Sequence, residues 1–449
     1  MFAAFANIFK IPELKQRILF TLGMIFCCRI IEIVPTPGVN PLELQRIIEG
    51  VQTRIGGGFL AFVDLFSGGA LAQCAVGALG IMPYISASII LQLMTALVPE
   101  LERLAREGEP GRQKLNQYTK YLTILICIIQ ASLLAISLEN PRALGISAQI
   151  VLDPGWGFRL MTVLTMTTAT MVLMWIGDQI TEYGIGNGIS LIITVNIISR
   201  LPRAIAQAGS LFISRGGTKA PFGPFHLIGL ILLMVIVVAV CILLTQGQRR
   251  IPIHMAKRVI GRKVYGGQST YMPLRVNYSG VMPLIFASVM IEFPAALLRM
   301  SNVQILKQIG NAFGTEAWLY MGTYGLLILF FSYFWVATQF NPIQIADDLK
   351  RNGGYVPGIR PGTPTAEYLD ATMSRVTLIG AIGLTAIAVI PSIMYRYFGI
   401  PWLVASFFGG TSLLIVVGVF LDTMKQVESY LLMRHYDGFL SHGRLQGRR

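Results

Sequence analysis

Charge is scarce in this sequence of 449 residues. Only 13% of the residues are charged, whereas a soluble globular protein carries about 25%. The deficit is concentrated in long runs, and residues 160–177, 227–245 and 376–395 contain no Asp, Glu, Lys or Arg. A helix of about 20 apolar residues crosses a lipid bilayer, so the sequence excludes an ordinary soluble domain and predicts a helical membrane protein.

Patterns typical of catalytic and metal sites are also missing. The five cysteines lie in or beside apolar stretches without a C-x-x-C pair, and the four histidines are scattered. The sequence contains no Walker-A glycine loop and no pair of Asp residues at membrane depth. We therefore expect no enzyme activity, no metal site and no cofactor.

The apolar runs predict an all-α polytopic membrane protein with ten transmembrane helices. An even number of spans places both termini on one side, and 24 of the 36 Lys and Arg residues then lie on that side, with 11 on the other. The richer side is expected to be cytoplasmic. The predicted spans lie near residues 18–34, 77–98, 118–138, 158–177, 187–203, 226–246, 280–298, 318–338, 376–395 and 403–422.

The uncharged stretch 65–99 is longer than one membrane crossing requires. It contains Gly68, Gly69, Gly77 and Gly80, and glycine disfavours a continuous helix. We expect a short re-entrant half-helix followed by a full span. Non-helical backbone at membrane depth is either packed within protein or lines a watery cavity, and both interpretations remain open here.

Two loops on the cytoplasmic side are long. Residues 247–279 contain seven basic residues and no acidic one, and residues 338–375 are rich in Gly and Pro. Turn-forming residues at this density project a loop away from the bilayer. Each loop is interpreted either as a determinant of topology or as a docking surface for a partner.

Segments of similar sequence occur in both parts of the chain. GNGISLII (186–193) opens span five, and GGTSLLI (409–415) lies in span ten, which crosses the membrane in the opposite direction. This similarity favours two pseudosymmetric five-helix halves of inverted topology, an arrangement common in membrane transport proteins.

An ordered set of motifs resembles the SecY family of protein-translocation channels. The motifs are FSGGAL (66–71), ALGIMPYISASII (78–90), GIGNGIS (184–190), QRRIP (248–252), AKR (256–258), VPGIRPG (356–362) and GGTSLLI (409–415). They follow the family order along nearly the whole chain. The resemblance implies a multi-pass protein of a bacterial plasma (inner) membrane, which passes unfolded secretory polypeptides across it and releases membrane-protein helices into lipid.

The resemblance also implies a division of the chain. A cytoplasmic segment (1–17) precedes the N-terminal half (18–203), and an external connection (204–225) leads to the C-terminal half (226–422) and a cytoplasmic tail (423–449). A plug is implied at about 61–72, and an apolar ring closes the pore. The implied plug residues are Phe62, Asp64, Phe66, Ser67, Gly68 and Gly69, and the implied ring residues are Ile81, Ile85, Ile193, Ile285 and Ile415.

A lateral gate is implied between spans two and three on one side and spans seven and eight on the other, with Gln92 and Asn277 as its polar members. The implied partners are SecE, SecG, the motor ATPase SecA, the ribosome, signal sequences, unfolded preproteins and membrane lipid. The candidate contacts for SecA or the ribosome are Arg249, Arg250, Lys257, Arg258, Arg262, Lys263 and Arg360.

Two positions depart from the family pattern. Tyr183 stands where a basic residue is expected, and Glu292 interrupts span seven. The alternative function is a secondary transporter of small solutes, which usually places ionisable residues at the bilayer midplane. The charges deep within the predicted spans are few, namely Arg29 and Glu32 in span one and Glu292 in span seven, so the protein channel is favoured.

Overall fold

The computed structural model describes residues 12–39, 64, 66–71, 73–139, 151, 153–212, 223–255, 258–260, 263–265, 269–300, 303–314 and 317–442. Each of the ten predicted spans overlaps a helix. Among the described helices, seven are long and apolar enough to cross a membrane, or eight if Met82–Leu97 and Pro99–Ala105, bent by 105°, form one span. The predicted helical, polytopic fold is confirmed, and the number ten stays a prediction.

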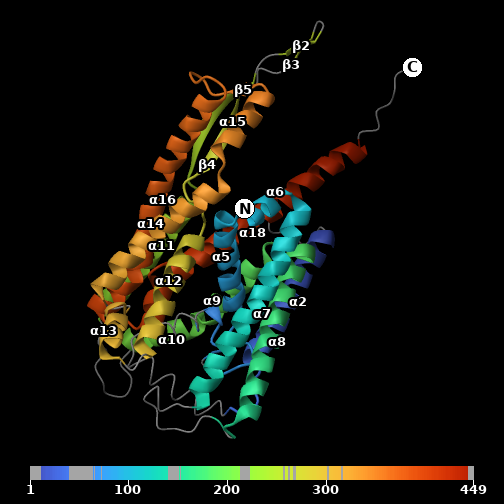
Figure 1. The fold of residues 1–449 in the computed structure, drawn as a ribbon. Helices are drawn as coiled ribbons and strands as arrows, with labels where there is room; N and C mark the ends of the chain where they lie inside the picture. Colours follow the sequence, from blue (N-terminus) through green and yellow to red (C-terminus); the bar gives the residue numbers. More distant parts are fainter. Residues whose placement is uncertain are drawn as a thin grey trace. The chain divides into compact units, whose positions relative to one another are not determined.

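The chain forms two compact units, Met1–Ala206 with Val419–Arg449, and Gln207–Gly418. In the first unit, α7 (Glu109–Glu139) lies between α5 (Met82–Leu97) and α8 (Trp156–Tyr183), and α8 also packs on α2 (Pro12–Ile33), as Figure 1 shows. α6 (Pro99–Arg106) connects α5 to α7. α9 (Gly188–Ser199) follows α8, and α10 (Leu201–Phe212) leads out of the unit.

Small side chains let the helices of the first unit approach closely. Every fourth residue of α7 between positions 119 and 135 is buried and small, and the hydroxyl of Thr123 donates a hydrogen bond of 2.7 Å to the carbonyl of Thr119. Such stripes are typical of helix packing in membranes, where close contact replaces the hydrophobic driving force. The stripe consists of Thr119, Thr123, Cys127, Ala131 and Ala135.

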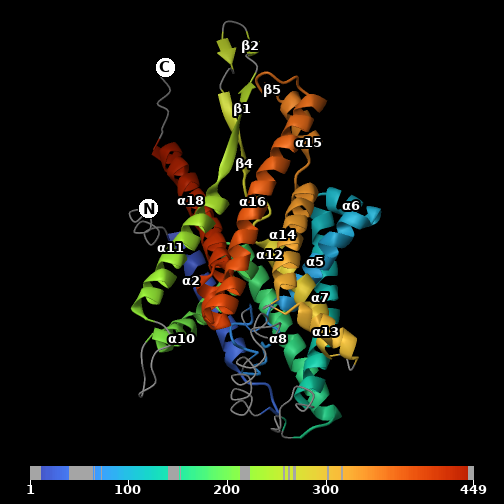
Figure 2. The same ribbon diagram turned by 90° about the vertical axis from the view of Figure 1, so that its left-hand side faces the viewer.

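The second unit is built around α14 (Trp318–Gln339), which packs against α12 (Met282–Met300) and α16 (Thr363–Phe398), as seen in Figure 2. α16 continues well beyond the predicted span 376–395. The other helices of this part of the chain are α11 (Pro224–Gln246), α13 (Gln304–Ala312), α15 (Pro342–Arg351), α17 (Trp402–Phe408) and α18 (Thr411–His442), which continues into the first unit.

The loops of the second unit contain strands that the sequence analysis did not predict. β1 (Gln248–Met255) lies between β4 (Ser269–Arg275) and β5 (Gly354–Tyr355) in an antiparallel sheet, and β2 (Arg258–Ile260) pairs with β3 (Lys263–Tyr265). Pro252 and Pro273 obscured the strands, because proline argues against a central strand. β5 pairs only with His254 and Met255, so Pro252 lies where β1 has a single neighbour.

Candidate functional site

The segment between α2 and α5 is the least regular backbone in the described part of the first unit. Ser67 to Leu71 form turns, and the hydroxyl of Ser67 donates to the carbonyl of Asp64 at 3.2 Å. Gly68 and Gly69 have φ angles of +65° and +92°, a region that glycine adopts without strain. We call the described residues 64 and 66–71 the turn segment. Phe62, the remaining implied plug residue, lies outside the described residues.

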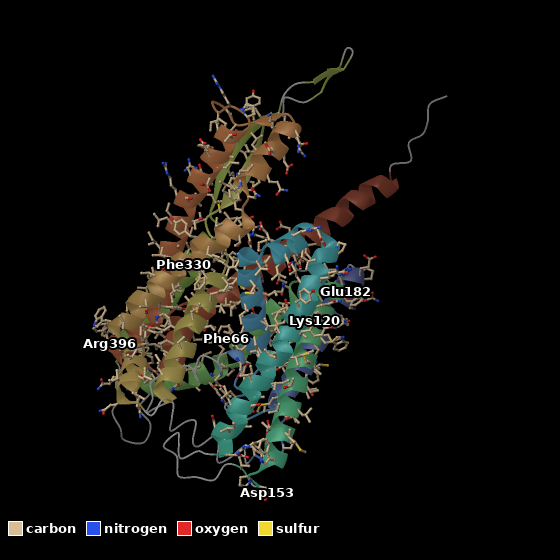
Figure 3. All side chains as sticks on the ribbon, in the orientation of Figure 1. Phe66, Lys120, Asp153, Glu182, Phe330 and Arg396 are labelled. Atoms are coloured by element: carbon tan, nitrogen blue, oxygen red, sulfur yellow. The ribbon has the colours of Figure 1, made fainter. Side chains whose placement is uncertain are left out.

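The turn segment is buried inside the first unit. Asp64, Phe66 and Ser67 are only 2%, 3% and 0% exposed. Phe66 lies between the two ends of the unit, which Glu182 and Asp153 mark in Figure 3. Irregular backbone is therefore enclosed by protein at the depth of the helices, as the bilayer requires.

Polar side chains from the end of α9 contact this segment. The Nδ2 of Asn196 donates to the carbonyl of Phe66 at 2.9 Å, and the hydroxyl of Ser199 donates to the carbonyl of Gly68 at 3.3 Å. The guanidinium of Arg200 forms an ion pair with the carboxylate of Asp64. These hydrogen bonds satisfy backbone carbonyls that no helix uses.

A second ion pair lies beside this contact. Arg29 and Glu32 pair on α2, and the guanidinium of Arg29 also donates to the Oδ1 of Asn196 at 3.5 Å. The sequence analysis noted Arg29 and Glu32 but overlooked Asn196 and Arg200. Their spacing of four residues in an apolar helix was the available signal, because polar residues in spans are expensive and often functional.

The five implied ring isoleucines are all buried. Ile81 precedes the first turn of α5, Ile85 follows one turn later, and Ile193 lies in the middle of α9. In the second unit, Ile285 lies near the start of α12 and Ile415 near the start of α18. Their exposed fractions are 2%, 6%, 7%, 3% and 3% for Ile81, Ile85, Ile193, Ile285 and Ile415.

The two implied gate residues differ in environment. Gln92 is exposed on α5 and donates to Ser88 of the same helix at 3.4 Å. Asn277 is buried in the second unit, and its Oδ1 accepts from Ser279 at 3.4 Å. The Nδ2 of Asn277 has no hydrogen-bond partner among the described residues. A buried amide donor of this kind is available for a new contact.

The implied contact residues lie on or beside the sheet. Arg249 and Arg250 are exposed on β1, and Arg360 is exposed just before α16. Arg258 and Lys263 are described by their backbone alone, in β2 and β3, while Lys257 and Arg262 lie outside the described residues. The base of the sheet is apolar, since Ile251 and Leu274 pack with residues of α14 and α16.

The structure accounts for one of the two departures from the family pattern. Tyr183 is exposed and packs edge-to-face on Phe20, with ring centroids 6.2 Å apart. Arg17 of α2 supplies a positive charge at this turn by donating to the carbonyl of Gly184 at 3.3 Å. Glu292 lies in α12, and only its backbone is described. Within the described ranges, no three His, Cys, Asp or Glu side chains are grouped to hold a metal.

Comparisons with known proteins agree with this architecture. The SecY family model matches residues 75–424. The protein translocase subunit SecY of Streptomyces griseus is 42% identical over 98% of this chain and 100% of its own length. Two solved structures share the fold over 92% of each chain. They are a SecY protein whose plug domain stabilises the closed state (TM-score 0.55, 17% identity) and Sec61 in the canine ribosome-channel complex (TM-score 0.52, 16% identity).

The family model begins just after the turn segment and includes the sheet and the helices from α5 to the first part of α18. The relative from Streptomyces griseus matches nearly the whole chain. A family model covering more than half of the chain and a relative matching over its full length identify a multi-pass membrane protein of the translocase class. The chain therefore belongs to the SecY family, whose members are protein-conducting channel subunits rather than enzymes.

Proposed function

We propose that this chain forms the channel through which unfolded secretory polypeptides cross a bacterial plasma membrane and from which membrane-protein helices enter lipid. The observation that carries the proposal is the buried, irregular turn segment within a bundle of apolar helices, in a chain of the SecY family. Such backbone at membrane depth belongs beside a conduit or inside packed protein.

The proposed architecture has ten spans in two inverted halves, with both termini in the cytoplasm. It is supported by the overlap of every predicted span with a helix and by the excess of Lys and Arg on one side. Helices α2 and α12 are the remaining two of the ten proposed spans, because the other eight correspond to the seven apolar helices and the bent pair.

The proposed constriction is formed by Ile81, Ile85, Ile193, Ile285 and Ile415. Isoleucine suits this role because its branched side chain is stiff and carries no polar group. An apolar constriction resists wetting and ion flow while a polypeptide passes. The turn segment is the proposed plug of this pore, and the SecY protein with a stabilising plug domain supports the assignment by its shared fold.

Opening is proposed to occur sideways as well as along the pore. A signal sequence would bind the open state more strongly than the closed state and shift the population toward it. Gln92 and Asn277 are the proposed polar members of this gate. The unused Nδ2 donor of Asn277 supports its assignment, because it can bind a partner in another state.

The proposed partners are SecE and SecG in the membrane and SecA or the ribosome at the cytoplasmic loops. The Sec61 of similar fold in the canine ribosome-channel complex supports a ribosome as partner. The exposed Arg249, Arg250 and Arg360 are the proposed contacts among the described side chains. Basic side chains of this kind bind acidic protein surfaces and RNA phosphates.

Uptake of a preprotein into vesicles tests the proposed function. Vesicles containing the chain, SecE, SecA and ATP are expected to protect a signal-bearing preprotein from protease, and vesicles without the chain are not. A working SecY channel assembled with the same SecE serves as the control. No uptake by the chain beside that working control would contradict the channel and favour a solute transporter.

A further inference from the structure

The turn segment is attached to α9 by polar contacts of its backbone and by a buried ion pair. Asn196 and Ser199 donate to two of its carbonyl groups, and Arg200 pairs with Asp64. The side chains of Arg200 and Asp64 are only 6% and 3% exposed. These four contact residues come from one turn at the end of α9 and from the start of the turn segment.

The fit between the two elements is close. A Cβ atom on Gly68 would lie 2.7 Å from the guanidinium of Arg29 and 3.3 Å from the Cα of Asn196. Gly69 lies beside Arg200, and a Cβ atom on Gly69 would be in ordinary contact with the Nε of Arg200 at 3.5 Å. The segment reaches its hydrogen-bond donors because Gly68 lacks a side chain and because both glycines adopt a positive φ that other residues rarely take.

The buried ion pair makes the attachment depend on water. Separating Asp64 from Arg200 in a dry environment leaves two uncompensated charges, which is strongly unfavourable. Once water reaches both groups, each is solvated and the separation is far easier. The turn segment can therefore leave α9 readily only after water has reached Asp64 and Arg200.

We propose that Asp64, Asn196, Ser199 and Arg200 form a hydration-dependent latch that holds the turn segment on α9. The inference rests on the proposed channel function, in which this segment is the plug. A client that wedges the pore admits water, and water releases the latch. The same residues keep the unoccupied channel closed, because the paired state of Asp64 and Arg200 is favoured over the separated state while water is excluded from both groups.

Charge-altering variants of the chain, assembled with SecE in vesicles, test the latch. Asp64→Asn leaves Arg200 buried without a counter-charge, so the closed state is destabilised. We expect its ion leak to rise about tenfold or more. Uptake of a preprotein with a weakened signal is expected to rise relative to uptake with the intact signal, whereas simple damage to the fold would lower both. Lys307→Gln, on the exposed face of α13 in the second unit, is the control for lost positive charge and is expected to behave as wild type.

The double variant Asp64→Leu with Arg200→Met separates a latch from a general need for these residues. Replacing a buried ion pair by apolar side chains is often neutral or stabilising, so its ion leak is expected to return to the wild-type level. Its uptake of the weakened-signal preprotein is expected to equal or fall below that of wild type.

Two results would overturn the latch. One is an unchanged leak and unchanged signal preference in Asp64→Asn while wild type takes up the intact preprotein. The other is a double variant that leaks as much as Asp64→Asn. Failure of the wild-type chain to take up the intact preprotein, beside a working control channel, would instead overturn the proposed function.

Discussion

His254 and Tyr355 are paired residues of β1 and β5, and their rings stack with centroids 6.0 Å apart. This contact joins the loop 247–279 to the loop 338–375 through one sheet. Below it, residues of both loops share an apolar core with α14 and α16, formed by Ile251, Leu274, Val336, Phe340, Val356, Leu369 and Met373. The two proposed docking surfaces therefore share one packed base.

Removing the Tyr355 ring is expected to loosen this joint. A cross-strand aromatic pair contributes roughly 0.2–1 kcal/mol, so Tyr355→Ala should speed amide exchange at residues 253–255 by up to about fivefold. Hydrogen–deuterium exchange of the purified protein measures this. Tyr355→Phe keeps the ring and should exchange as wild type does. Equal exchange in Tyr355→Ala and wild type would show that the stacked pair does not stabilise the joint.

Polar substitution of a proposed ring residue is expected to raise ion leak. Ile193 is 7% exposed and Ile198, on the same helix, is 44% exposed. Ile193→Ser places a hydroxyl in the proposed constriction and lowers its resistance to wetting, so conductance across vesicles should increase several-fold. Ile198→Ser is the matched control and should leave conductance unchanged. Equal conductance in the two variants would argue that Ile193 only packs the helices.

Close packing of α8 on α9 makes Gly188 sensitive to a single methyl group. A Cβ there would lie 2.9 Å from the Cβ of Ile180, whereas a Cβ on Gly209 of α10 would meet nothing within 4 Å. Overpacking costs about 1–3 kcal/mol, so Gly188→Ala should lower the thermal unfolding temperature in detergent. Gly209→Ala should raise it slightly, because alanine favours the helix by roughly 0.5–1 kcal/mol. A stable Gly188→Ala protein would mean that α8 and α9 can separate without loss.

Loss of positive charge from β1 is expected to weaken docking of the ribosome. Arg249 and Arg250 are exposed, so their contribution is largely electrostatic and sensitive to salt. In the double variant Arg249→Ala with Arg250→Ala, the slope of log affinity against log salt should decrease by about 1–2. Co-sedimentation of vesicles with ribosomes over a salt series measures the slope. Lys307→Ala on α13 is the control, and a slope equal to wild type in the β1 variant would place the contact elsewhere.

The sequence by itself determined which segments form apolar helices and which segment between them is irregular. Uncharged runs such as 227–245 have one stable solution in a bilayer, a helix, and α11 (Pro224–Gln246) lies there. The glycines of 66–80 likewise indicated irregular backbone, because their effect is local. These features depend on neighbouring residues and solvent alone, so the sequence pattern carries them.

Only the tertiary structure decided which distant residues meet. Asp64 and Arg200 are 136 residues apart in sequence, with the helices α5 to α9 between them, and neither residue type nor spacing indicates that they pair. β1 and β5 were equally hidden, since prolines weaken the local strand pattern and β5 has two residues. Such contacts depend on how helices pack and where the chain returns, and the free energy that selects them is spread over the whole unit rather than over any one segment.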